Sequence, residues 1–253
     1  MAEATRTFSK NRLLDKLPDR ERTGLLSKMR WRPIVPQEML QPPGQDVGQV
    51  YFPLTGVISL MTPLEDGSAI EVAAVGNEGM VGVHAFLGGR PLGNVQAMSQ
   101  VPGEMLSMDA ETFRAVADRG GELRGVMVSY SQALFAQIAQ AVACNGGHEV
   151  QQRTAKWLLE VHDRAGADEF QLTQEFLADM LGVTLFSVSA AAGVLQAAGL
   201  IRYGRGRVVV LDREALEEAS CECYVAARDE YERLLGPKPQ RSRSPALHHL
   251  HSV

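Results

Sequence analysis

Residues 174–193, QEFLADMLGVTLFSVSAAAG, decide how the C-terminal part of this chain folds. Two short helical segments flank Gly182, and the small Ala178 stands where the second helix must cross the first closely. With Val188 on the inward side, the spacing of four and then six residues suits two helices that cross steeply over a tight turn. Thr184 stands where the second helix needs an N-cap acceptor. The segment therefore predicts a helix-turn-helix, and an ordinary helical hairpin inside a core is the alternative.

The residues after this motif predict a two-stranded hairpin. Leu200–Tyr203 and Val208–Leu211 have the composition of strands, and Gly204-Arg205-Gly206 makes the tight connection between them. A hairpin directly after a helix-turn-helix is a wing, and cations on it are well placed for DNA phosphates, which supply affinity without reading sequence. A solvated hairpin with ordinary surface arginines is the alternative. The cations of the predicted wing are Arg202, Arg205 and Arg207.

Length and composition indicate two domains of ordinary size, since the chain has 253 residues and 45% of them are hydrophobic. No apolar stretch approaches the roughly 20 residues of a membrane span and no charged-then-apolar leader opens the chain, so we expect a cytoplasmic protein without a membrane partner. The net charge is −5, and acidic residues slightly outnumber basic ones between Asn145 and Arg213. Attraction to DNA must therefore be local, from the wing together with Arg153 and Lys156.

The first third of the chain predicts an antiparallel β-roll. Short apolar or alternating runs are separated by turn signals such as Glu65-Asp66-Gly67 and Pro102-Gly103. Several strands at this spacing are typical of a small barrel or roll. A helical segment over residues 13–29, with a break at Pro18, precedes them. The predicted strands span residues 50–52, 56–62, 69–75, 95–101 and 104–108.

A long helix is predicted from Glu122 to Ala143, because apolar residues recur there at steps of three and four. One face of such a helix can pack on the sheet while another meets a second copy of the chain. Packing that is wholly intramolecular is the alternative. Asn145-Gly146-Gly147 is predicted to break the helix and to act as a hinge before a further helix over residues 148–164.

These features predict an α+β fold, with an N-terminal antiparallel β-roll, a long dimerisation helix and a C-terminal winged helix-turn-helix. The predicted parts are the β-roll effector domain (1–119), the long helix with its hinge (120–145), the winged helix-turn-helix (146–235) and a disordered tail (236–253).

This order of elements resembles the Crp/Fnr family of bacterial transcription regulators, named after the cyclic-AMP receptor protein and FNR. The resemblance runs from Asn11 to about Leu235 and implies an effector domain that controls the angle and spacing of two DNA-binding domains. The implied partners are double-stranded DNA, a second copy of the chain as a homodimer, an unknown small-molecule effector and, as a further candidate, RNA polymerase. The segments that carry the resemblance are VYFPLTGVISL (50–60), GNEGMVG (76–82), LTQEFLADMLGV (172–183) and GLIRYGRGRVVVLDR (199–213).

The predicted effector site departs from the cyclic-nucleotide pattern. Family members that bind cyclic nucleotides hold the ribose with a glutamate and the phosphate with an Arg-Ser pair. In the corresponding segment, Gly79 to Val95, Met80 replaces the glutamate and Gly93-Asn94 replaces the Arg-Ser pair. A buried phosphate without a cation is strongly disfavoured. Arg90 is the sole cation of the segment and a weak candidate for effector binding, with a surface loop arginine as the alternative, so we expect an effector other than cyclic AMP.

The predicted recognition helix is unusually apolar. Positions that commonly hold Arg, Glu and Arg in the family hold Leu185, Phe186 and Ala190 here. Each bidentate pair to a base is worth about 1–3 kcal/mol of discrimination, so their loss weakens sequence reading. A ligand-sensing or protein-interaction module, with Leu185-Phe186 as its contact surface, is therefore the alternative function. Gln196 is a further polar candidate. The predicted DNA-binding residues are Thr184, Leu185, Phe186, Ser187, Ser189, Ala190, Arg202, Arg205 and Arg207.

No residues point to a cofactor, a metal or a catalytic site. The chain has three cysteines and none precedes Cys144, which excludes the N-terminal iron–sulfur ligands of FNR-type oxygen sensors. Cys221 and Cys223 are predicted to lie on different faces of one helix over residues 214–235, in packing roles. His84, a lone histidine, is expected to be a core or surface residue, and a haem or metal ligand, as in a carbon-monoxide-sensing branch of the family, is the alternative. Phosphate loops, nucleophile elbows and metalloprotease motifs are absent from the sequence, so we expect no enzyme.

Overall fold

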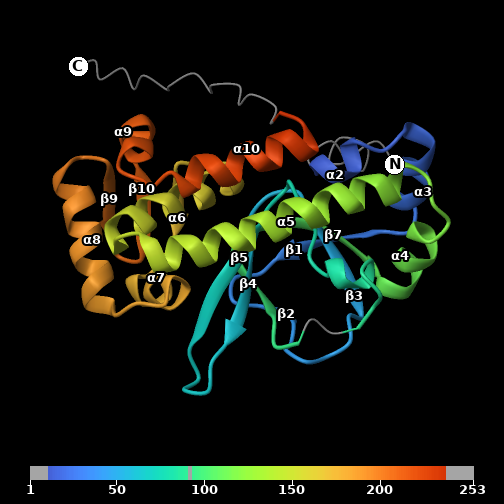
Figure 1. Ribbon diagram of the computed structural model, residues 1–253, viewed down its shortest axis with the longest axis horizontal. Helices are drawn as coiled ribbons and strands as arrows, with labels where there is room; N and C mark the ends of the chain where they lie inside the picture. Colours follow the sequence, from blue (N-terminus) through green and yellow to red (C-terminus); the bar gives the residue numbers. More distant parts are fainter. Residues whose placement is uncertain (1–10, 91–92, 238–253) are drawn as a thin grey trace, which may run out of the picture.

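The computed structural model describes residues 11–90 and 93–237, which form an N-terminal roll and a C-terminal helical part along one long helix (Figure 1). The predicted tail falls outside the described residues from residue 238 onward. In the described part no single helix is both long and apolar enough to cross a membrane. Two helices, α7 (Gln174–Leu181) and α8 (Leu185–Ala197), reach that length and apolarity only together, and they are bent by 109°.

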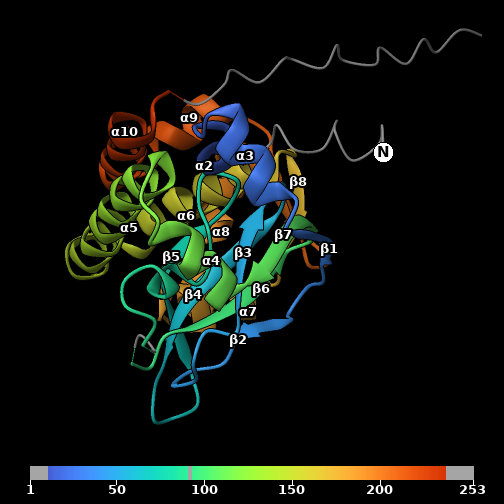
Figure 2. The same cartoon turned by 90° about the vertical axis from the view of Figure 1, so that its right-hand side faces the viewer.

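The N-terminal part is a roll of two antiparallel sheets, with strand orders β1-β7-β3 and β2-β6-β4-β5 (Figure 2). All five predicted strands are confirmed to within one residue at each end. β1 and β2 were not predicted. The strands are β1 (Arg30–Ile34), β2 (Met39–Gln41), β3 (Gln49–Pro53), β4 (Val57–Pro63), β5 (Ala69–Val75), β6 (Gln96–Val101) and β7 (Gly103–Asp109).

The turn before β4 shows why glycine is needed there. Gly56 has a φ of 81°, in the left-handed region that side chains with a Cβ rarely adopt. A Cβ on Gly56 would also lie 2.6 Å from the carbonyl oxygen of Val101, because the turn lies against the end of β6. Glycine therefore allows β4 and β6 to pair up to this end of the sheet.

Short helices close the N-terminal end of the roll. The predicted break at Pro18 separates α2 (Arg12–Asp15) from α3 (Asp19–Leu26). The buried Asn11 caps α2 with its side-chain oxygen and donates its Nδ2 to the carbonyls of Pro53 and Gly79, at 2.9 and 3.0 Å. One side chain thus ties the start of the chain to two loops of the roll. A 3-10 turn, η1 (Val83–Ala85), and α4 (Ala110–Ala117) complete this part.

The long helix α5 (Glu122–Gly147) is confirmed, but the predicted position of its break is wrong. The helix continues through Gly146-Gly147 and ends at His148, whose backbone is extended. A glycine costs about 1 kcal/mol in a helix, and here both glycines lie in the last turn, where they are exposed. The next helix, α6 (Val150–Ala165), begins after a capping box at Glu149, so the connection between the helices, called the hinge below, is the dipeptide His148-Glu149.

The C-terminal part is a winged helix-turn-helix, as predicted. Ala178 is buried at the crossing of α7 and α8, and Gly182 turns the chain with a φ of 62°. The hairpin of β9 (Ile201–Gly204) and β10 (Arg207–Val210) forms the wing. A third strand, β8 (Glu169–Gln171), pairs with β10 and was not predicted.

The final segment is two helices, so the prediction of one helix over residues 214–235 is wrong. α9 (Arg213–Glu218) ends before a connection that contains Cys221, and α10 (Cys223–Leu235) follows. The two cysteines therefore do not lie on one regular helix. α10 lies along α5 in both views (Figures 1 and 2) and packs against it.

The two parts share a packed interface. Apolar side chains of β4, β5 and β6 belong to the same core as those of α6, α7 and α8. The indole Nε1 of Trp157, on α6, donates to Oε1 of Glu71, on β5, at 3.0 Å. Arg164, also on α6, pairs with Glu78 of the roll at 2.7 Å, and both side chains are about nine-tenths buried. The winged helix-turn-helix is thus docked on the roll through apolar and charged contacts.

Candidate nucleic-acid interface

The N-terminal half of α8 faces solvent. Phe186 is 82% exposed and Leu185 is 44% exposed, whereas Val188 and Leu195 on the opposite side are buried. Figure 1 places α8 at the end of the molecule farthest from α3 and α4. The helix is therefore presented outward by α7, as a recognition helix must be.

The polar residues predicted on α8 mostly bond within the motif. The hydroxyls of Thr184 and Ser187 lie 2.9 Å apart, and Thr184 also caps the helix by accepting from the Ser187 amide. Ser189 donates to the side-chain oxygen of Gln174 at 2.5 Å. Gln196 accepts from the amide of Tyr203 at 2.6 Å and so links α8 to the wing. The outward surface that remains is apolar: it includes Leu185, Phe186, Ala190 and Val194.

The wing carries its cations around a two-residue turn. Arg205 and Gly206 both have positive φ, 53° and 71°, which matches the tight hairpin turn favoured by the twist of two strands. Arg202 and Arg205 are exposed. Arg207 pairs with Glu169 of β8 at 3.1 Å, and both side chains are more than half exposed. The acidic partner therefore offsets part of the charge that Arg207 contributes.

Arg153 and Lys156 do not belong to this surface, so the prediction that they extend the basic patch is wrong. Arg153 is buried, and its guanidinium donates to the carbonyl of Leu181 and, at 2.8 Å, to the side chain of Asn145. Lys156 is partly buried, with a side chain that is 12% exposed, and it pairs with Glu160 at 2.9 Å. The sequence shows that both residues belong to the DNA-binding domain. Only the packing of α6 shows that the helix face that carries them points into the protein. Arg153 instead joins the end of α5 to the end of α7.

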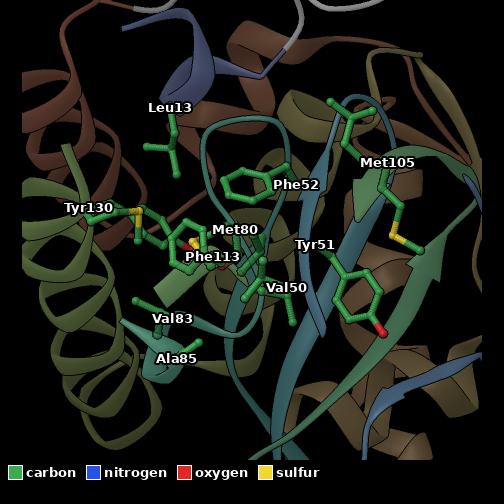
Figure 3. Close-up of a cluster of buried hydrophobic side chains, with 14 of the residues drawn as sticks. Leu13, Val50, Tyr51, Phe52, Met80, Val83, Ala85, Met105, Phe113 and Tyr130 are labelled. Carbon is green, nitrogen blue, oxygen red and sulfur yellow. The ribbon is translucent and has the colours of Figure 1, made fainter. Parts of the chain in front are cut away.

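The segment that corresponds to the cyclic-nucleotide cassette has an apolar interior. Met80 is fully buried and belongs to the same core cluster as Phe113 and Val83 (Figure 3). The hydroxyl of Tyr130, on α5, donates to the carbonyl of Met80 at 2.7 Å. A Cβ on Gly79 would lie 2.7 Å from that hydroxyl, so the tyrosine sits directly against the cassette backbone.

The two polar candidates near the cassette lie in different environments. Arg90 is exposed. His84 is buried in η1, and its Nε2 lies 2.9 Å from Nε2 of Gln41. Burial lowers the pKa of His84, which favours the neutral imidazole. His84 is thus a core residue with a hydrogen-bond partner, as predicted.

Comparisons with known proteins agree with both parts of the fold. The cyclic nucleotide-binding domain model matches residues 31–119, and the Crp-like helix-turn-helix domain model matches residues 152–219. The chain belongs to the Crp/Fnr family. It is a Crp/Fnr-type DNA-binding transcription regulator with a cyclic-nucleotide-binding domain.

Several solved Crp/Fnr structures share the fold of this regulator. FixK2 from Bradyrhizobium japonicum is 19% identical over 76% of this chain and 98% of its own, with a TM-score of 0.64. The c-di-GMP responsive global regulator CLP from Xanthomonas campestris is 14% identical over 76% and 99%, with a TM-score of 0.63. A CRP-family transcriptional regulator from Thermus thermophilus is 21% identical over 75% and 96%, with a TM-score of 0.62. No curated protein matches the sequence.

Two features of this Crp/Fnr chain escaped sequence reasoning. The exposed face of α5 carries an apolar stripe that includes Val128, Phe135 and Val142. The three cysteines meet His148 at the hinge. The seven-residue spacing of the stripe is visible in the sequence, but which face of α5 stays exposed depends on where α10 packs.

Proposed function

We propose that this Crp/Fnr protein acts as a homodimer that binds double-stranded DNA through α8 and the wing and responds to a small-molecule effector. The observation that carries the proposal is the outward α8, bent by 109° from α7 and flanked by exposed Arg202 and Arg205. An exposed helix next to a cationic hairpin suits a major groove with its bordering phosphates.

The exposed stripe of α5 supports the dimer. Val128, Phe135 and Val142 are 45%, 73% and 69% exposed and recur every seven residues, as the a positions of a coiled coil do. The positions between them are Gln132 and Ala139, both exposed as well. Apolar side chains in such a row are typical of a contact surface. A second α5 packed along this stripe would bring two copies of α8 into one assembly.

The interior of the cassette supports an effector other than a cyclic nucleotide held in the usual way. Met80, which the sequence pattern assigns to the position of the ribose-binding glutamate, is buried among apolar side chains. Arg90 is exposed, which does not suit the cation that a buried phosphate requires. We infer that the effector is recognised by a different set of contacts on the roll.

A DNA titration tests the proposal. Fluorescence anisotropy would follow the full chain with a duplex from its own upstream region and with a scrambled duplex, at salt concentrations from about 50 to about 200 mM. We expect tighter binding to the upstream duplex and a logarithmic affinity that falls with logarithmic salt concentration. Absence of binding to both duplexes, in the presence of cell extract as a source of effector, would contradict the proposal.

Wing variants sharpen the test. Arg205→Asn keeps the left-handed turn, which asparagine tolerates, and should weaken binding to both duplexes. The salt slope should fall by about 0.9 for each phosphate that the wing no longer neutralises. Glu169→Gln removes the partner of Arg207 and should strengthen binding. If Arg205→Asn leaves the slope unchanged, the wing does not contact DNA.

A second candidate function is a protein-interaction module, which the exposed Leu185-Phe186 pair favours. The variant Phe186→Ala distinguishes DNA binding from the protein-interaction function. If α8 reads DNA through apolar contacts such as thymine methyls, the variant should lose preference for the upstream duplex while keeping its affinity for the scrambled one. A wild-type chain that binds neither duplex would favour the interaction module instead.

A further inference from the structure

All three cysteines of the chain meet at the hinge, although Cys144 is separated from Cys221 and Cys223 by more than seventy residues. The Sγ atoms of Cys144 and Cys221 lie 3.5 Å apart, and Sγ of Cys223 lies 3.5 Å from Nδ1 of His148. The four ligand atoms all lie within 4.8 Å of one another. No disulfide joins the cysteines.

These distances match the edges of a tetrahedron around one metal ion. Zinc in proteins has Zn–S bonds of about 2.3 Å and Zn–N bonds of about 2.0–2.1 Å, which place its ligand atoms about 3.5–3.8 Å from one another. Three thiolates and one imidazole are also a ligand set that structural zinc sites use. An iron–sulfur cluster would need its cysteines farther apart, because cluster atoms stand between them.

The local structure delivers the four ligands from two places. Cys144 lies in the last turn of α5, and His148 follows four residues later, where the helix has ended. Cys221 lies in the connection between α9 and α10, and Cys223 is the first residue of α10. The three cysteines are almost completely buried. Packing of α10 along α5 thus brings the two ligand pairs together.

Side chains around the cluster orient the ligands. Nε2 of His148 lies 3.1 Å from a carboxylate oxygen of Glu222, so the imidazole can donate there and keep the lone pair of Nδ1 for a metal. Nε2 of Gln140 donates to Sγ of Cys223 at 3.0 Å. Carboxylate-to-histidine and amide-to-sulfur contacts of this kind accompany metal ligands in proteins.

Positive charge next to the cluster suits the charge of a loaded site. A divalent ion with three thiolates and a neutral imidazole carries a net charge of −1. The cations Arg153 and Lys156, on α6, are close enough to Cys144 to interact electrostatically with it. These are the residues that the sequence alone assigned to the DNA surface.

We propose that Cys144, His148, Cys221 and Cys223 bind one zinc ion at the hinge. The ion joins the end of α5 to the start of α10, next to the dipeptide where α6 begins. Arg153 extends the connection, since it contacts both Asn145 of α5 and the carbonyl of Leu181 at the end of α7. Zinc therefore holds the region through which a change in the roll would reach the recognition helix. The site does not depend on DNA binding.

Metal analysis of the untagged full chain, purified under reducing conditions, tests the site. We expect one zinc per chain, and replacement by Co²⁺ should give thiolate-to-metal charge-transfer absorption with the visible bands of a tetrahedral ion. Cys144→Ser and Cys223→Ser should each lose the metal. Glu222→Gln should weaken zinc binding about 10–100-fold, because it removes the anionic partner of the ligating histidine.

Two control variants should retain the zinc. His84→Gln changes a buried histidine of the roll, and a chain with His248, His249 and His251 all changed to alanine removes the histidines of the tail. If the serine variants do not fold, the wild-type chain still decides: bound zinc should protect all three thiols from a thiol reagent, and chelation should expose them.

Four results would overturn the proposal. They are a metal-free chain with three reactive thiols, a chain that contains iron with acid-labile sulfide, a Cys144–Cys221 disulfide in the reduced preparation, and zinc retained by both serine variants.

Discussion

At the scale of single residues, Glu71 is the group whose environment changes its chemistry most clearly. Its carboxylate is buried between the two parts and accepts from Trp157 and, at 2.5 Å, from Ser59. Burial raises the pKa of Glu71 to about 7, and the opposing hydrogen bond from Ser59 does not offset it. Below about pH 7 the carboxyl group at the contact between β5 and α6 is therefore mostly protonated and uncharged.

The raised pKa gives a pH-dependent stability. An unfolded glutamate has a pKa of about 4.3, so between about pH 4.3 and about pH 7 the folded protein holds a proton that the unfolded chain releases. The stability from this group is therefore complete below about pH 4.3 and is lost as the pH rises to about 7. We expect Glu71→Gln, which cannot ionise, to gain about 2 kcal/mol relative to wild type between about pH 5 and about pH 7.5.

Denaturant unfolding followed by circular dichroism at the two pH values measures this difference. Glu104→Gln, a change at a carboxylate outside the interface, serves as the control and should follow the wild-type profile. Parallel profiles for Glu71→Gln and wild type would show that the carboxyl is already ionised in the folded protein.

Residue roles were the hardest feature to predict from the sequence. The apolar run Val50–Phe52 and the spacing of Ala178, Gly182 and Val188 report local geometry, so they predicted a strand and the helix-turn-helix correctly. The role of Arg153 depends on which face of α6 is buried. The proximity of Cys144 to Cys221 depends on how elements far apart in the sequence pack together. A local sequence pattern carries no information about such contacts.

At the scale of elements, the two faces of α5 have different environments. Tyr130 and Met127 are fully buried against the roll, whereas Phe135 is largely exposed. We expect Phe135→Glu to convert a dimer into monomers, because two charges would face each other at the centre of the stripe. Sedimentation equilibrium at micromolar concentration measures the mass.

The matched control is Leu64→Glu. Leu64 is an exposed apolar residue in the β4–β5 connection, and Figure 1 shows the end of this hairpin away from α5. This variant should remain dimeric. A wild-type chain that is monomeric at micromolar concentration would contradict the role given to the stripe.

Elements that the sequence did not predict share a physical cause. β1 reads RWRPI and contains Pro33, which interrupts any strand pattern, yet the strand lies at the edge of its sheet, where proline is tolerated. β2 and β8 have three residues each, too short for an alternation to show. The hinge lies at His148-Glu149 because α5 remains helical through both glycines and the backbone becomes extended only at His148.

At the scale of the whole molecule, the buried pair of Arg164 and Glu78 joins the two parts. Burial alone would raise the pKa of Glu78, but the charge and hydrogen bond of Arg164, together with backbone hydrogen bonds, outweigh burial and lower the pKa. We expect Glu78→Gln to destabilise the protein by about 3–5 kcal/mol, because it leaves a buried guanidinium without its anion. Equilibrium unfolding in urea measures the loss.

The exposed pair of Glu230 and Arg233 provides the comparison. Glu230→Gln should change stability far less than Glu78→Gln, since surface pairs contribute little. Equal effects of the two substitutions would mean that the contact between the parts is hydrated and open.

The contact between Tyr130 and Gly79 limits how the sensor can move. A methyl group does not fit between the phenol of Tyr130 and the backbone of Gly79. The segment at Gly79 therefore cannot approach α5 more closely without displacing Tyr130. A ligand that displaces this segment by a fraction of an ångström must therefore shift the helix with it. Any movement of the roll that leaves α5 in place must therefore occur in segments other than the one at Gly79.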